Sequence, residues 1–189
     1  MYKIIALIGE AGCGKDTILK KVLAAAPDRL NEIISCTTRP MREGEVNGIN
    51  YYFLTEEEFL LEAVRGHMIE KAYFNGWNYG TSYDTLSTDK VNIGVFNPTG
   101  IYSLLKRDDI ELWVYKIEVK DKTRLLRQLN REENPNVGEI IRRYQTDKID
   151  FQNLYFEYSN LPNETTEHLQ AAVKEILTQA QTMGGEGQN

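Results

Sequence analysis

The chain has 189 residues, of which 41% are hydrophobic and 26% are charged, which fits one compact domain with its own core. Its formal net charge of -6 argues against nucleic-acid and anionic-membrane partners, because docking on polyanions needs a surplus of lysine and arginine. The two cysteines, Cys13 and Cys36, are too few for a disulfide framework, and no apolar run is long enough to span a membrane. We therefore expect a cytoplasmic protein.

Buried strands and helices are expected to alternate along the chain. Residues 2–8 are an almost purely apolar run, which is typical of a strand buried on both faces of a parallel sheet, and a helix follows Lys15. A capping box at Thr55 and Glu58 opens a helix towards Arg65. Further strands are expected at 33–35, 51–54, 68–74, 91–96 and 112–119, and further helices at 83–86, 100–106, 122–132, 137–150 and 165–181. The alternation predicts a three-layer α/β domain with a central parallel sheet.

Two segments are expected to stay outside the core. Residues 39–50 are polar and contain one proline and two glycines, so they are expected to form an exposed loop. Residues 183–189 are rich in glycine and polar side chains, and we expect a disordered tail there.

A glycine-rich loop joins the first strand to the first helix. Gly9, Gly14 and Lys15 satisfy the Gly-x-x-x-x-Gly-Lys pattern in the strand–loop–helix context that it requires. The loop amides and the helix N-terminus would bind the phosphates of ATP, and Lys15 would bridge its β- and γ-phosphates. The residues expected at these phosphates are Gly9, Ala11, Gly12, Cys13, Gly14, Lys15, Asp16 and Thr17. The alternative is a glycine-rich turn that only links strand to helix.

Position 16 departs from this pattern. A serine or threonine normally follows the lysine and offers a hydroxyl to Mg²⁺, whereas this chain has Asp16. A carboxylate is an acceptable hard oxygen ligand for Mg²⁺, although it adds negative charge beside a triphosphate. Asp16 as a metal ligand is therefore a hypothesis.

Residues 35–53 and 69–82 carry a more specific pattern. The first stretch has the order Ser, Thr-Thr-Arg, Arg, Gly-Glu-Val-Asn-Gly and Tyr-x-Phe, and it resembles the guanylate kinase family. The resemblance implies one domain at 1–182, with a core at 1–34 and 83–182, a subdomain for the nucleoside monophosphate at 35–82 and a lid at about 124–147. It implies phosphate transfer from ATP to GMP or dGMP with Mg²⁺. The acceptor positions that it implies are Ser35, Arg39, Arg42, Tyr51, Glu70, Tyr79 and Thr81.

The chemistry of these residue types supports that assignment. Guanine presents two donors on one edge, N1–H and the 2-amino group, and the single carboxylate of Glu70 can accept both. Hydroxyls of Ser35 and Thr81 can serve O6 and its neighbours. The two arginines, Arg39 and Arg42, can grip the α-phosphate in planar forks, aided by tyrosine hydroxyls. Taken singly, each of these residues could equally be an ordinary surface charge or a packing aromatic.

Arginines on two expected helices suggest a lid. Arg124, Arg127 and Arg131 share one helical face, and Arg142 and Arg143 follow beyond a turn at 134–136. Phosphate transfer needs cations on the moving group and exclusion of water, which such a lid supplies. The resemblance favours Arg131 and Arg143 as catalytic residues, together with Lys15 and Arg39. The alternative is a solvated face paired with acidic neighbours.

The end of the strand expected at 91–96 departs from the family. Guanylate kinases have two aspartates there, whereas this chain has Val95 and Asn97. Asn97 can still hydrogen-bond the acceptor base or a metal-bound water, and Asp16 is a candidate to offset the missing charge. Two other functions stay open, a broader deoxynucleoside-monophosphate kinase and a non-catalytic guanylate-kinase-like binding module. Partners are expected to be nucleotides, and the chain a monomer or homodimer.

Overall fold

The computed structural model describes residues 1–74, 76–131 and 133–185. Its larger sheet has five strands in the order β2-β7-β1-β8-β9, and every pairing in it is parallel. The strands are β1 (Tyr2–Ile8), β2 (Leu30–Glu32), β7 (Val91–Val95), β8 (Ile110–Glu118) and β9 (Ser159–Pro162). The predicted α/β class with a central parallel sheet is confirmed.

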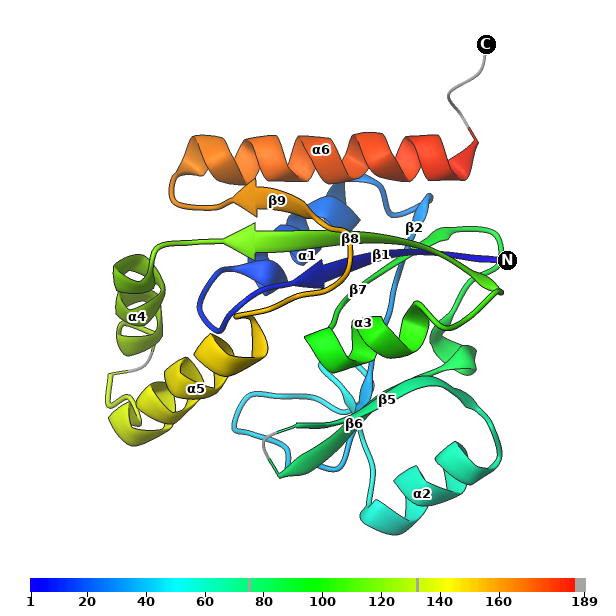
Figure 1. Ribbon diagram of the computed structural model, residues 1–189, viewed down its shortest axis with the longest axis horizontal. Coiled ribbons are helices and arrows are strands. Elements are labelled where there is room, and N and C mark those ends of the chain that lie inside the picture. The colour runs from blue at the N-terminus through cyan, green and yellow to red at the C-terminus, as the bar shows by residue number, and fades with distance from the viewer. Residues whose placement is uncertain (75, 132, 186–189) are drawn as a thin grey trace.

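The central strand β1 buries side chains on both of its faces. Ile5 and Leu7 pack into a cluster with two helices on one side of the sheet, whereas Ile4, Ala6 and Ile8 belong to a second cluster on the other side. Figure 1 shows α6 and α1 on the first side and α3 on the second. These helices are α1 (Lys15–Ala25), α3 (Pro98–Leu104) and α6 (Thr166–Gly184). Burial on both faces explains why β1 reads as a continuous apolar run.

A second, mostly antiparallel sheet lies on the α3 side of the core (Figure 1). Its order is β4-β3-β6-β5, and only β3 and β4 pair in parallel. Its strands are β3 (Cys36–Thr37), β4 (Tyr52–Phe53), β5 (Met68–Phe74) and β6 (Trp77–Ser82), and they are joined by α2 (Glu56–Val64) and followed by a 3-10 turn η1 (Tyr83–Thr85). The predicted capping box is confirmed, because the Glu58 amide donates to Thr55 and Glu58 accepts from the Thr55 amide.

Two helices follow β8 and lie beyond the carboxyl ends of β1 and β8 (Figure 1). They are α4 (Asp121–Leu129) and α5 (Val137–Asp150). Asn136 caps α5, since its side chain accepts the Glu139 amide at 3.0 Å. Because the chain leaves β1 at that same edge of the sheet, both helices lie beside the loop that joins β1 to α1.

The strand predicted at 33–35 is wrong. The core strand ends at Glu32, and the segment after it crosses from one sheet to the other. Ile33 still donates its amide to Ile93 of the core sheet at 2.8 Å, whereas Ser35 already accepts the Tyr52 amide of the small sheet at 2.9 Å. A segment that changes sheets within three residues cannot form a strand of either.

The end of the last helix and the start of the tail also differ from the prediction. Helix α6 continues to Gly184, and Met183 is only 5% exposed because it packs into the core cluster of α1 and α6. Gly185 ends the helix in a left-handed conformation with φ 87°. Residues 186–189 of the predicted tail lie outside the described residues. The helix predicted at 122–132 ends at Leu129, and Glu132 also lies outside them.

Candidate active site

The loop between β1 and α1 depends on its glycines, as Gly12 and Gly14 show. Gly12 has φ +82°, and a Cβ there would lie 2.5 Å from the backbone oxygen of Arg124 in α4. Gly14 has φ +94° at the N-terminus of α1, and a Cβ there would lie 2.5 Å from Asn163 Nδ2. Any other residue would therefore be strained and would collide with a neighbour. The glycines allow the loop to curl tightly against α4 and the end of β9.

Lys15 lies inside this loop. Its ammonium donates to the carbonyl oxygens of Gly9 at 2.6 Å and Glu10 at 3.3 Å, and Cys13 Sγ lies 3.6 Å away. Asp16 and Thr17 follow in the exposed first turn of α1. The residues predicted to bind the phosphates of ATP thus form one continuous stretch, made of the loop and the first turn of α1, with the Lys15 ammonium inside the loop.

Three side chains that the sequence prediction missed hold this loop in place. Asn163 donates to the Cys13 carbonyl at 2.8 Å, Arg127 donates to the same carbonyl at 3.4 Å, and Gln128 donates to the Ala11 carbonyl at 3.3 Å. Arg127 was visible in the sequence only as part of a helical arginine face. No motif in the sequence pointed to Asn163 or Gln128, because their contacts arise from segments more than 110 residues away.

Glu70 is the buried carboxylate of the second sheet. It is 7% exposed, and its Oε1 accepts the hydroxyl of Thr81 at 2.8 Å, because β5 and β6 pair these two residues directly. The Ser35 hydroxyl lies 3.5 Å from that of Thr81. The structure therefore brings together the three residues expected to recognise guanine. Burial raises the pKa of Glu70 to about 7, and the Thr81 hydrogen bond only partly opposes this.

This burial predicts a pH-dependent stability. A pKa of about 7 in place of 4.5 corresponds to a loss of about 3 kcal/mol of unfolding free energy at alkaline pH, because the folded state resists ionisation of Glu70. The favourable burial of the neutral form is present below pH 4.5 and is lost as the pH rises through 7. Relative to the wild type, the unfolding free energy of Glu70→Gln should therefore increase by about 2 kcal/mol from pH 5.5 to pH 8.5. Urea unfolding without nucleotide measures both proteins at the two pH values.

The exposed Glu57 on α2 provides the control for that experiment. Glu57→Gln should differ from the wild type by the same small amount at both pH values. A stability difference between Glu70→Gln and the wild type that does not change with pH contradicts the burial argument.

Arg39 is buried rather than exposed, in contrast to the loop predicted around it. It is 7% exposed and forms two hydrogen bonds with Glu45, at 3.0 and 2.8 Å, while the rings of Tyr51 and Phe53 lie 5.5 Å from its guanidinium. Burial by itself lowers the pKa of Arg39, and the Glu45 carboxylate together with Tyr79 more than offsets this. Glu45, which the prediction did not single out, therefore fixes the plane of this guanidinium.

Two further arginines lie near Arg39, Arg42 in the loop at 39–50 and Arg143 on α5. Desolvation and then the charges of Arg143 and Arg39 lower the pKa of Arg42, so the three guanidinium groups repel one another. Glu139 partly neutralises this cluster by accepting from Arg143 Nε at 2.8 Å. An oxyanion placed among these arginines would relieve the repulsion. Arg131 lies just past α4 and is exposed, and its catalytic role stays a prediction.

The loop between β1 and α1, residues 9–14, is called the phosphate loop because it is predicted to bind phosphates. It interacts electrostatically with the second sheet. Burial, together with the charges of Tyr79 and of Asp16, raises the pKa of Tyr51 to about 12. The rings of Tyr51 and Tyr79 lie 6.0 Å apart, edge to face. Asp16 belongs to the first turn after the loop, so its charge acts on Tyr51, the residue before β4 of the second sheet.

Asn97 has a structural task that the prediction did not include. Its side chain caps α3 by accepting the Gly100 amide at 2.8 Å. A Cβ at Gly100 would lie 2.9 Å from Glu70 Oε2, so the start of α3 is close to the buried carboxylate. Asn97 is thus near the expected base site, and its amide oxygen already accepts one hydrogen bond. Its predicted contact with the acceptor stays a prediction.

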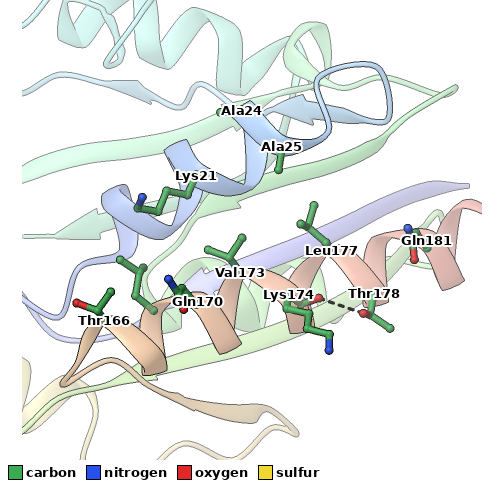
Figure 2. A pocket seen from close by; sticks show the side chains of 11 residues that line it. Lys21, Ala24, Ala25, Thr166, Gln170, Val173, Lys174, Leu177, Thr178 and Gln181 are labelled. Atoms are coloured by element: carbon green, nitrogen blue, oxygen red, sulfur yellow. Dashed lines mark hydrogen bonds between the residues drawn. The ribbon is translucent and has the colours of Figure 1, made fainter.

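A separate groove of about 720 Å³ lies between α1 and α6 (Figure 2). All the residues that line it come from these two helices, and none belongs to the phosphate loop or to the second sheet. Across residues 1–74, 76–131 and 133–185, no helix has the length and apolar character needed to cross a membrane.

Known proteins resemble this chain over most of its length. The family model described as guanylate kinase matches residues 1–180. A guanylate kinase from Malacoplasma penetrans is 32% identical over 161 residues, which are 81% of this chain and 82% of that protein. One from Chlorobium luteolum is 44% identical over 79 residues, which span 42% of this chain and only 40% of the relative. The crystal structure of guanylate kinase from Anaplasma phagocytophilum has a similar fold, with a TM-score of 0.69, 19% identity, and coverage of 97% of this chain and 86% of that one.

The parallel α/β fold and these matches together define a kinase, a class of phosphate-transferring enzymes. The chain belongs to the guanylate kinase family. The family resemblance noted in the sequence is thereby confirmed.

Proposed function

We propose that the protein transfers the terminal phosphate of ATP to GMP or dGMP. The observation that carries this proposal is the buried Glu70 carboxylate beside the hydroxyls of Thr81 and Ser35. An ionised carboxylate accepts the two donors of guanine, whereas the bare N1 acceptor of adenine would be repelled. Since the site is buried, a base that leaves these groups unpaired is rejected strongly.

The phosphates would be held by two groups of cations. Lys15 and the loop amides would bind the β- and γ-phosphates of ATP, and Arg42 with Arg143 would bind the phosphate of the acceptor. Arg39 contributes its charge from a plane fixed by Glu45. Phosphate transfer needs in-line positioning and positive charge on the moving group rather than a covalent intermediate, and these residues supply both. Arg131 is included in the proposal as a further lid cation.

Mg²⁺ belongs to the same proposal. Asp16 lies one residue after Lys15, in the exposed first turn of α1. Mg²⁺ at such sites takes one or two carboxylates together with substrate phosphates, and the Asp16 carboxylate fits that requirement. The parts of the chain that the structure describes hold no cluster of three or more His, Cys, Asp or Glu for a metal. When bound, Mg²⁺ would neutralise phosphate charge.

The role of Asp16 can be tested by titration with Mg²⁺. We expect Asp16→Ala to raise the Mg²⁺ concentration for half-maximal rate by about tenfold, because one hard oxygen ligand is lost. Asp28→Ala, at an exposed position beyond α1, is the control and should leave the titration unchanged. An unchanged Mg²⁺ dependence in Asp16→Ala would remove this residue from the metal site.

A coupled assay of ADP release across GMP, dGMP, dTMP, AMP and CMP tests the function as a whole. The proposal requires GMP or dGMP to exceed the other acceptors by at least about 10²-fold in kcat/KM. Comparable rates with dTMP or CMP would favour the broader deoxynucleoside-monophosphate kinase, which Asp16, Val95 and Asn97 left open in the sequence. If ATP is not consumed with any of these five acceptors, a non-catalytic binding module is favoured. A reaction in the cytoplasm by a monomer or homodimer completes the proposal.

A further inference from the structure

A fully buried arginine joins the helices α4 and α5 to the phosphate loop. Arg124 is 0% exposed, and its Nη2 donates to Glu10 Oε1 in the loop at 3.2 Å. Its Nε donates to Asp121 Oδ1 at 3.1 Å, and its guanidinium lies 4.4 Å from the centre of the Tyr144 ring. From the sequence, the alternative for this arginine was a solvated helical face. A buried guanidinium requires carboxylate partners, and these partners come from three different elements.

Asp147 on α5 is the partner that reaches the loop backbone. Its Oδ2 accepts Arg124 Nη1 at 3.3 Å and the amide of Ala11 at 2.7 Å. Its side chain is 8% exposed. Burial raises the pKa of this carboxyl, and the Ala11 amide together with Lys15 and Arg124 opposes that change. Asp147 therefore lies within the electrostatic reach of the loop lysine.

The geometry of one peptide links Asp147 to Lys15. The Ala11 N–H and the Glu10 C=O belong to the same planar trans peptide, so they point in opposite directions. With the N–H held by Asp147, the Glu10 carbonyl points to the inside of the loop. There it accepts the Cys13 amide at 3.2 Å and the Lys15 ammonium at 3.3 Å.

We propose that Asp147 is a positioning residue for the donor nucleotide, which acts through the Glu10–Ala11 peptide on Lys15. Arg124 holds the carboxylate in place, so the position of α5 and the shape of the phosphate loop depend on each other. This inference rests on the proposed function, because it assumes that the loop binds ATP. Asp147 need not touch the nucleotide for this role.

Two substitutions separate positioning from simple packing. Asp147→Ala removes the acceptor, leaves the Ala11 amide unpaired and frees the peptide to rotate, so we expect the Kd for ATP with Mg²⁺ to rise about tenfold. Asp147→Asn keeps an acceptor oxygen of the same shape, and its Kd should stay within about threefold of the wild type. Asp150→Asn, one turn further along α5, is the matched control and should leave the Kd unchanged.

The measurements are calorimetric titration with ATP and Mg²⁺ in the absence of GMP, and the KM values for ATP and GMP. In Asp147→Ala, we expect the Kd and the KM for ATP to rise. The KM for GMP should stay within twofold of the wild-type value. If Asp147→Ala does not fold, Asp147→Leu fills the same space without an acceptor and should give the same result. An unchanged or lower Kd for ATP, or equal losses for ATP and GMP, overturns the positioning role.

The same titration separates this inference from the proposed function. A wild type that binds no ATP overturns both. A wild type that binds ATP but phosphorylates no GMP overturns only the proposed acceptor, and the comparison of Asp147→Ala with Asp147→Asn still decides the role of Asp147.

Discussion

Replacement of Lys15 by alanine is expected to lower kcat for phosphate transfer from ATP to GMP by about 10³-fold. The ammonium lies inside the loop, 2.6 Å from the Gly9 oxygen. From there it can stabilise the negative charge that develops between the β- and γ-phosphates during transfer. Alanine leaves the loop amides in place, so ATP binding weakens less than the rate falls. Coupled ADP release at saturating ATP and GMP measures kcat directly.

Lys21→Ala is the matched control for this change. Lys21 lies on the same helix α1, is exposed, and lines the groove in Figure 2 rather than the loop. Its replacement should leave kcat within about twofold, because surface charges at this distance are screened by salt. If Lys15→Ala kept more than a tenth of the wild-type kcat, the loop would not be the site of transfer.

The phosphate loop could be predicted because its determinants are local. The order of strand, glycines, lysine and helix lies within 25 consecutive residues, and the glycine conformations follow from the tight turn that this order requires. Strands β1 and β5 were found for a similar reason. Their residues are apolar or alternate regularly, and the structure has them at the predicted residues.

The elements that were missed lack a local signal. Strand β9 has four residues, ends in Pro162, and lies at the edge of the sheet, where it pairs with β8. Strand β6 contains Gly80, whose missing side chain makes room for Met68 and Phe59. In both cases the partner strand rather than the segment itself determines the structure.

The contacts around Arg124 show a stricter limit of sequence reasoning. The spacing correctly places Arg124 and Arg127 on one helix, whereas Arg131 lies past the end of α4. It does not tell whether that helical face meets solvent or protein. The burial of Arg124 depends on Asp147 and Glu10, which are 23 and 114 residues away from it. Only the folded chain brings these charges together.

Glu70→Gln is expected to lower kcat/KM for GMP by about 10²-fold while the Kd for ATP changes by less than twofold. The carboxylate can accept both guanine donors, whereas glutamine turns one of its acceptors into a donor that faces a donor. The remaining contact with Thr81 does not compensate, because the buried groups of the base stay unpaired. Initial rates with GMP and AMP at saturating ATP measure the change in preference.

The pH dependence of the wild type follows from the same carboxylate. With a pKa raised by burial to about 7, Glu70 is largely neutral at pH 6 and largely ionised at pH 8 in the free protein. Only the ionised form accepts both donors, so kcat/KM for GMP should rise between these pH values in the wild type and stay level in Glu70→Gln. Equal losses for GMP and AMP, or parallel pH profiles of the two proteins, would assign guanine recognition to other residues. The exposed Glu57→Gln should reproduce the wild-type profile, because its carboxylate lies outside the acceptor site.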